Sequence, residues 1–337
     1  MHGAGGLSAT VQIWRGGLIE SAHRVVIAVV DGQGRLRAQA GNIEHVTFAR
    51  SAIKPMQAIP LIEDGVASRF GMTRRELALC CASHNAEPRH VEGVIALLKR
   101  FGITPDALAC GPHMPLGEQA ARSLRALGRQ PDRVHNNCSG KHAGMLGLAL
   151  TNGWPLEGYH ESGHPVQQRM LREMSRWTGV EESAIPIAVD GCGVTTFALS
   201  VSAMAKGFAM LARAARQKES AAAILLEAMA RHPDYVAGEN RLCSALMGAV
   251  AGRIIAKVGA EGVYCAAVPG ADLGIALKVM DGATRAAEPA LLAVLHRLGL
   301  VTAAELASLT RWVEPAVMNT RGERVGSIRV SLELGPL

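Results

Sequence analysis

Two segments near the start of the chain have the apolar, β-branched composition of strands. They cover residues 10–14 and 23–30, and the second reads H-R-V-V-I-A-V-V. The D-G-Q-G sequence at 31–34 is a turn signal, so residues 35–41 are predicted to return as the second strand of a hairpin. The chain therefore begins with β-structure.

From about residue 52 to 231 the hydrophobic pattern is mostly helical. Apolar residues recur at helical spacing in 52–65, 87–100 and 164–177. An Ala-rich stretch over 198–231 is also predicted to be helical, with a break near Gly207.

Strands return after this region. Residues 262–269 and 275–282 flank a Gly-Ala-Asp-Leu-Gly connection and are predicted to form a hairpin. A helix is expected over roughly 285–299, and V-G-S-I-R-V-S-L-E-L at 325–334 has the pattern of a last strand.

This order predicts an α+β fold in which a helical region is inserted between two halves of one antiparallel sheet. We interpret 1–337 as a single domain, with 1–50 and 255–337 as the sheet-forming halves and 51–254 as the mainly helical region. A dinucleotide-binding fold is not expected, because no strand is followed by G-x-G-x-x-G.

Composition indicates a globular protein with a large core. Hydrophobic residues make up 49% of the 337 positions and charged residues 19%, and no apolar run is long enough to span a membrane. Aromatic residues are only 4% and the basic residues are scattered, which argues against nucleic-acid binding despite a net charge of +6. Seven cysteines without a visible secretion signal favour free thiols in a cytoplasmic protein.

Lysine is scarce, since 28 of the 35 basic residues are arginine. Composition bias is sufficient to explain the ratio. Only lysine, however, can lose its proton near neutral pH and act as a base, so the position of each lysine matters.

The first chemical candidate is Ser51 with Lys54, in R-S-A-I-K. If Ser51 starts a helix, both side chains lie on one face of its first turn, where a lysine could take the proton of a serine nucleophile. The plainer interpretation is a helix-capping serine beside a surface lysine.

Three other polar clusters stand beside apolar segments. C-C-A-S-H-N-A-E-P at 80–88 contains Ser83 and either caps the next helix or lines a site. V-H-N-N-C-S-G-K-H-A-G-M at 134–145 and A-V-D-G-C-G-V at 188–194 carry thiols that are either buried structural cysteines or two ligands of a shared zinc ion. The fourth cluster, A-K-V-G-A-E-G-V at 256–263, places Lys257 just before a strand, where a surface lysine is the plainer interpretation.

Together these stretches resemble the Rhizobium-type bacterial L-asparaginases, also called asparaginase II. The resemblance runs from about residue 10 to 335. It rests on R-S-A-I-K-P-M-Q-A, C-C-A-S-H-N, C-G-P-H-M-P, H-N-N-C-S-G-K-H-A-G-M, G-H-P-V-Q and D-G-C-G-V-T-T-F-A-L-S, in that order. It implies a fold similar to serine β-lactamases and bacterial glutaminases.

The resemblance also implies two catalytic Ser–Lys pairs. Ser51 and Lys54 match the first pair, and Ser83 matches the second serine. Lys257 is placed as its lysine, with Lys278 as the rival.

A zinc site is implied as well, with Cys138, Lys141 and Cys192 as ligands and Asp190 close by. In the family this ion supports the site more than it performs hydrolysis. A lysine can bind a metal only after losing its proton.

The implied substrate is L-asparagine. Arg50, His135, Asn136 and Arg241 are the candidates for contacting it. Residues 235–244 read Y-V-A-G-E-N-R-L-C-S where Gly-Thr-Gly-Arg is expected, so contacts from this loop differ from the family pattern.

The implied reaction is release of aspartate and ammonia through an acyl-enzyme. The alternatives are a related serine amidohydrolase acting on glutamine or a β-lactam, and a non-catalytic protein that binds an amino acid or zinc. A homodimer is expected, because symmetric oligomers are common among soluble enzymes.

Overall fold

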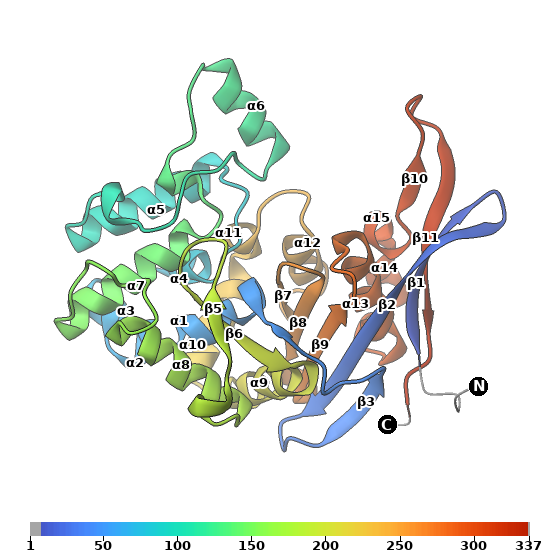
Figure 1. Cartoon of the computed structure of the whole chain (residues 1–337), viewed down its shortest axis with the longest axis horizontal. Coiled ribbons are helices and arrows are strands. Elements are labelled where there is room, and N and C mark those ends of the chain that lie inside the picture. Colours follow the sequence, from blue (N-terminus) through green and yellow to red (C-terminus); the bar gives the residue numbers. More distant parts are fainter. Residues whose placement is uncertain (1–7, 336–337) are drawn as a thin grey trace. The chain divides into compact units, whose positions relative to one another are not determined.

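An antiparallel sheet organises the first of the two units into which the chain divides (Figure 1). The computed structural model describes residues 8–335. The first unit, called the sheet unit, comprises the residues up to Ala52, Leu199–Arg213 and those from Ala249 onward. The second, called the helical unit, comprises Ile53–Ala198 and Ala214–Gly248.

Eight strands of the described residues form the sheet, in the order β10-β11-β1-β2-β9-β8-β7, with β3 paired to β2. They are β1 (Ala9–Arg15), β2 (Leu18–Asp31), β3 (Leu36–Ala40), β7 (Ile255–Val258), β8 (Val263–Val268), β9 (Leu273–Val279), β10 (Ala316–Met318) and β11 (Arg324–Leu332). A further short strand, β4 (Val46–Phe48), follows the first hairpin.

The central strands are buried on both faces. Every residue of β2 from Val25 to Asp31 is buried, and these residues pair with β9 in the register Val25↔Val279. A strand covered on both faces needs no polar alternation, which explains the unbroken apolar run in the sequence.

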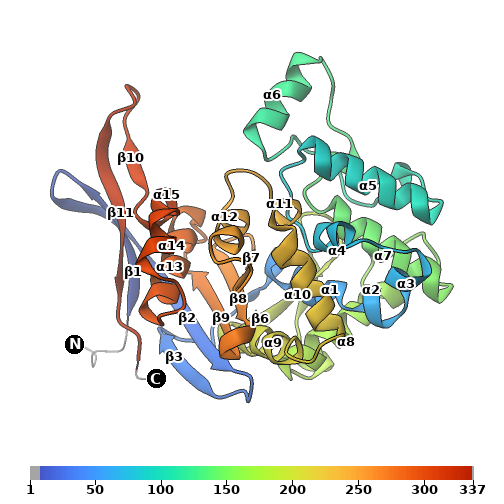
Figure 2. The same cartoon turned by 180° about the vertical axis from the view of Figure 1, so that it is seen from behind.

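Helices cover this sheet. Helix α13 (Thr284–Arg297) packs against β1, β2, β8, β9 and β11, and it lies beside α14 (Ala303–Ala307) and α15 (Thr310–Val313) (Figure 2). Helix α9 (Val201–Ala214) approaches β9 so closely that a Cβ on Gly274 would lie 2.1 Å from the carbonyl oxygen of Ala205.

The predicted α+β class and the hairpin at 262–282 are confirmed, since β8 and β9 pair antiparallel. The predicted helix break near Gly207 is wrong. Helix α9 runs through Gly207 to Ala214, because a glycine inside a helix costs only about 1 kcal/mol when the residue is packed. The break comes later, where the Ser220 side chain caps α10 (Ala221–Arg231).

Lys257 was also predicted to precede a strand, and it lies instead inside β7. The four residues of β7 are too few for a strand pattern to be read from the sequence.

The helical unit is built around α7 (Ser139–Asn152), which is buried from Ser139 to Ala149. Helices α1 (Lys54–Ala58), α2 (Pro60–Glu63), α3 (Val66–Arg69), α4 (Arg74–Cys80), α5 (Pro88–Phe101) and α8 (Pro165–Thr178) pack against it. The unit also contains α6 (Glu118–Ala126), α12 (Leu242–Ala249), and α10 and α11 (Pro233–Val236), which pack against α4. Strands β5 (Ile187–Val189) and β6 (Thr195–Ser200) form an antiparallel pair.

Glycines on α7 allow its neighbours to come close. A Cβ on Gly140 would lie 2.3 Å from the backbone oxygen of Leu79 in α4, and one on Gly147 would lie 2.7 Å from the Phe101 ring in α5. The N-terminus of α7 therefore abuts the C-terminus of α4.

None of the helices in the described part of the chain is both long and apolar enough to cross a membrane.

Replacing Gly140 with alanine tests this close contact. Gly140→Ala should lower the free energy of unfolding by roughly 2–4 kcal/mol, because a backbone carbonyl cannot move aside as a side chain can. Urea denaturation measures the change.

Gly248 is a matched control, since it lies in α12 and a Cβ added to it would have no neighbouring atom within 4 Å. Gly248→Ala should be neutral or stabilising by up to about 1 kcal/mol, because alanine favours helix. Equal effects of the two substitutions would contradict the close-contact account.

Candidate active site

The amine of Lys54 is the centre of a buried polar cluster in the helical unit. Lys54 is fully buried at the start of α1, and a short 3-10 turn over Arg50–Ile53, which contains Ser51, precedes it. Its Nζ donates to the backbone oxygen of Ala82, to Ser83 Oγ at 3.1 Å and to Cys138 Sγ at 3.2 Å. One lysine therefore joins the segment after α4 to the residue before α7.

The backbone holds Ser83 from both sides. Ser83 N donates to Val236 O at 3.0 Å, His84 N to Asn137 O at 3.1 Å and Asn85 N to Ala237 O at 2.9 Å. Successive amides thus bond alternately to the C-terminal end of α11 and to the turn before α7.

Asn136 shapes the turn before α7. Its side-chain oxygen accepts from Cys138 N at 2.9 Å, and its Nδ2 donates to Gly111 O. Both ends of the amide are engaged within the protein, so the contacts of Asn136 are those of a residue that orients Cys138.

A second set of contacts surrounds Lys141, which lies in the first turn of α7. Its Nζ lies 3.2 Å from Cys192 Sγ and 3.9 Å from Asp190 Oδ2. Cys192 and Asp190 lie in the turn that joins β5 to β6, which is closed by a bond from Gly193 N to Asp190 O. The three side chains are buried.

The charges in this second set are coupled. A hydrogen bond from Cys138, together with the nearby Lys141, lowers the pKa of Cys192 to about 5, although burial opposes the shift. The same bond to Cys192, with burial, raises the pKa of Cys138 to about 12. Burial alone would lower the pKa of Lys141, but the two sulfurs and Asp190 raise it above its ordinary value. These pKa shifts favour a protonated Lys141 beside an ionised Cys192.

The donor set fits a zinc ion only if Lys141 contributes. In residues 8–335, no three His, Cys, Asp or Glu side chains are placed to hold a metal ion together. Two sulfurs and one nitrogen are donors that zinc accepts, and four-coordinate geometry needs at least three of them. The predicted set of Cys138, Lys141 and Cys192 is therefore chemically suitable.

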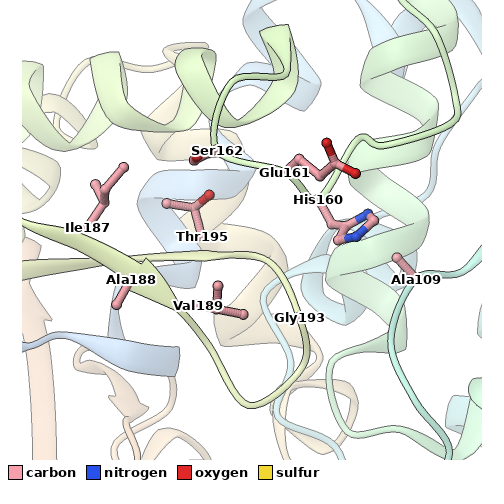
Figure 3. A pocket seen from close by; sticks show the side chains of 9 residues that line it. All are labelled: Ala109, His160, Glu161, Ser162, Ile187, Ala188, Val189, Gly193 and Thr195. Atoms are coloured by element: carbon pink, nitrogen blue, oxygen red, sulfur yellow. The ribbon is translucent and has the colours of Figure 1, made fainter.

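A surface cavity of about 580 Å³ opens beside the turn that carries Cys192 (Figure 3). Val189 and Gly193, on either side of that turn, line it together with His160 and Glu161. His160 Nδ1 is buried and has no hydrogen-bond partner among the described residues. The cavity gives solvent access to this side of the turn.

His135 lies in a different hollow. Its Nδ1 is 2.7 Å from Asp132 Oδ1, and the ring lines a cavity of about 320 Å³ with Glu87, Arg89 and Glu239. The hydrogen bonds given for His135 in the described part of the chain are to Asp132, not to Lys54 or Lys141.

Arg241 supports the segment that carries Ser83. Its guanidinium donates to Asn85 Oδ1 at 2.9 Å and to Ser83 O at 3.4 Å. Glu87 links this segment to the 235–244 loop, because its Oε1 accepts hydrogen bonds from Asn85 Nδ2 and from Glu239 N. Gly238 (φ 112°) is required there, since a Cβ would lie 2.4 Å from Glu87 Oε1. The divergent 235–244 loop is thus held by hydrogen bonds to the Ser83 segment.

The remaining predicted residues lie in the sheet unit. Arg50 and Ser51 are in the turn before α1, and Arg50 has a left-handed backbone (φ 51°). Lys257 is fully buried in β7, with its Nζ donating to Val258 O at 2.9 Å. Lys278 donates to two backbone oxygens at 2.6 Å, those of Glu261 and Val279, and burial lowers its pKa.

Two buried histidines were not assigned a role from the sequence. His84 accepts from Ala86 N through Nδ1 and contacts Ser139 Oγ at 2.9 Å through Nε2. His90 accepts from Glu87 N through Nδ1 and contacts Asp234 O at 2.8 Å through Nε2. The S-H-N run beside Ser83 was the available signal, but capping explained it equally well.

The sequence of this chain matches the family described as L-asparaginase II over residues 11–330. Among curated proteins, none matches.

Two solved structures are distantly similar. The crystal structure of Mglu in its native form is 16% identical with a TM-score of 0.45, and the match covers 83% of this chain and 66% of the Mglu chain, just under two thirds of its length. A candidate beta-lactamase from Bacteroides dorei DSM 17855 is 11% identical with a TM-score of 0.39, covering 81% of this chain and 85% of that chain.

The buried histidines should make stability depend on pH. Burial holds the pKa of His84 well below 6.5 and lowers that of His90, so both are neutral in the folded protein and bind protons only after unfolding. The free energy of unfolding should therefore fall as the pH drops below about 6.5, by up to roughly 1.4 kcal/mol per pH unit for each histidine.

Urea denaturation at pH 7.5, 6.5 and 5.5 measures this dependence above the range in which most carboxylates titrate. A free energy of unfolding that is constant over this range would contradict the assignment of neutral, buried imidazoles.

Proposed function

We propose that this chain, which belongs to the L-asparaginase II family, hydrolyses L-asparagine to L-aspartate and ammonia through a serine acyl-enzyme. Membership of the family makes it a hydrolase of the asparaginase type. The proposal of a serine acyl-enzyme rests on the fully buried amine of Lys54. This amine contacts Ser83 Oγ, and Lys54 lies three residues after Ser51.

Lysine suits this position for a chemical reason. As an ammonium, Lys54 donates one hydrogen bond each to Ala82 O, Ser83 Oγ and Cys138 Sγ. As a neutral amine it keeps two of these bonds and offers a lone pair to a hydroxyl proton. An arginine has no accessible neutral state and cannot make this exchange.

In the proposed first half-reaction, Lys54 takes the proton of Ser51 Oγ as this oxygen attacks the side-chain amide carbon of asparagine. The tetrahedral oxyanion is stabilised by backbone N–H groups. The C–N bond then breaks, the nitrogen takes a proton and leaves as ammonia, and a β-aspartyl ester remains on Ser51.

In the second half-reaction, water attacks the ester carbon and loses a proton, and Ser51 Oγ regains one as the C–O bond breaks. We assign the relay of these protons to Ser83 and Lys257, with Lys278 as the alternative to Lys257. Lys278 Nζ donates to the backbone oxygens of Glu261 and Val279, and Lys257 Nζ donates to that of Val258.

We assign a substrate contact to Arg50, because a guanidinium suits the substrate carboxylate. His135 was also predicted to contact substrate, but it is bonded to Asp132 and lines a different cavity. For Asn136 and Arg241 the observed bonds favour a supporting role, since they hold the Cys138 turn and the Ser83 segment.

We also propose that zinc is held by Cys138, Lys141 and Cys192, with Asp190 nearby. A bound divalent cation supplies compensating positive charge for the two thiolates. Cys138 would link the metal site to Lys54, because it contacts the Lys54 amine and immediately precedes α7. Binding requires Lys141 and Cys138 to release their protons.

Two substitutions test the serine mechanism. Ser51→Ala should lower kcat for ammonia release from asparagine by at least about 1,000-fold, since the nucleophile is lost. Lys54→Arg should lower kcat by roughly 100- to 10,000-fold, although the positive charge is kept. A coupled ammonia assay with asparagine and glutamine as substrates measures both and compares the two amides.

Lys99→Arg is the matched control, because Lys99 is an exposed residue near the end of α5. It should retain wild-type activity. A fully active Ser51→Ala or Lys54→Arg enzyme would refute the assigned roles.

Metal analysis tests the zinc site. Purified wild-type protein should contain up to one zinc per chain, and Cys138→Ala should lose it because one of two sulfur donors is removed. Cys265→Ala, at a buried cysteine of β8 in the sheet unit, should keep the metal. Equal zinc content in all three proteins would contradict the proposed ligand set.

A further inference from the structure

The Ser83 segment and the turn before α7 are joined at two consecutive residues. Lys54 Nζ bridges the first residue of each pair, Ser83 and Cys138, at 3.1 and 3.2 Å. His84 and Ser139, the next residue of each, are bonded directly from Nε2 to Oγ at 2.9 Å. The two links lie side by side along the chain.

The hydrogen bonds define the protonation of His84. Nδ1 accepts from Ala86 N at 3.1 Å, so the proton resides on Nε2 and is donated to Ser139 Oγ. Ser139 Oγ in turn donates to Val134 O at 2.9 Å. His84 and Ser139 are both fully buried, so water does not compete for these bonds.

The side chains of His84 and Ser139 are fixed by hydrogen bonds. Both nitrogens of the His84 ring and the proton of the Ser139 hydroxyl are engaged in hydrogen bonds, and the backbone bond from His84 N to Asn137 O lies beside them. A shift of the Ser83 segment away from α7 would break the His84–Ser139 bond and lengthen the distance from Lys54 Nζ to Ser83 Oγ.

We propose that His84 is a positioning residue, which acts through its bond to Ser139 to hold Ser83 Oγ against the amine of Lys54. It does not touch substrate or exchange protons in the reaction. The proposal rests on the proposed function, because its kinetic consequence requires the Ser83 hydroxyl, held beside the Lys54 amine, to take part in the proton relay.

The chain supplies a matched control. His90 stacks on His84 with ring centroids 5.1 Å apart, is equally buried and has the same pattern of an Nδ1 acceptor and an Nε2 donor. Its Nε2 bonds to Asp234 O, so this ring bond leads away from α7. A His90 substitution that removes the bond to Asp234 O therefore measures how far the loss of a buried histidine in this region lowers stability and activity by itself.

Asparagine and glutamine separate the two functions of the His84 ring. The amide of Asn lies near the position of Nδ1 and can still accept from Ala86 N, but it does not reach Ser139. The longer amide of Gln reaches the position of Nε2 and can still donate to Ser139.

The expected kinetic results follow. His84→Asn should lower kcat for asparagine by roughly 10- to 100-fold with KM changed less than about threefold, because the loss is of alignment and not of binding. His84→Gln should recover most of the kcat. Ser139→Ala should resemble His84→Asn, and the double variant should be no worse than either single variant.

His90→Asn should keep kcat within about threefold of wild type, even where its melting temperature falls. The proposal is overturned if His84→Asn has wild-type kcat, if His84→Asn and His90→Asn lose kcat equally, or if Gln restores no more than Asn.

A readout that does not depend on turnover distinguishes this proposal from the proposed function. In wild-type protein, NMR should detect a slowly exchanging Nε2 proton of His84, whose resonance is absent in His84→Asn and shifted in Ser139→Ala. If this signal is present but no ammonia is released from asparagine, the function is refuted and the His84–Ser139 link stands. If the Nε2 proton of wild-type His84 exchanges as fast as that of an exposed histidine, the link is refuted.

Discussion

The burial of the Lys54 amine is the constraint on which the rest of the site depends. A charged amine enclosed in protein needs a partner for every proton, and Lys54 finds them on Ala82, Ser83 and Cys138. These partners come from segments far apart in the sequence. Their arrangement is therefore fixed only when α1, the segment after α4 and the turn before α7 are packed together. The same contacts place an amine that can exchange a proton beside a serine hydroxyl.

Close helix packing is the means by which those segments meet. Gly140 lets the first turn of α7 lie against the last turn of α4, and Ser83 and Cys138 are then only a few residues from that contact. Lys141 lies one residue further along α7, where its Nζ is 3.2 Å from Cys192 Sγ. The contacts of Lys54 and the contact between Lys141 and Cys192 thus depend on the same packing, and a change in the turn before α7 is expected to affect both.

Much of the fold could be predicted because hydrophobic periodicity is a local property. The apolar run of β2 and the helical spacing of α5 and α8 were readable, and the sheet with an inserted helical region followed from their order. For the candidate active site, the sequence predicted which residues take part but not which of them contact one another. The pairing of Ser83 with Lys257 stays a prediction, and the structure adds a contact between Ser83 and Lys54 that the sequence did not predict. Spacing along the chain cannot predict the bond between Lys54 and Ser83, which are 29 positions apart. It also cannot predict that the side chains of Asn136 and Arg241 form hydrogen bonds within the protein.

The most direct test of the account is to locate the acyl group during turnover. Wild-type enzyme mixed with asparagine should be quenched in acid within milliseconds, digested and examined by mass spectrometry. The account predicts an aspartyl ester on the peptide that contains Ser51, dependent on asparagine and absent from Lys54→Arg enzyme. An aspartyl ester on the peptide that contains Ser83, or turnover of asparagine with no acylated peptide at any quench time, would contradict it.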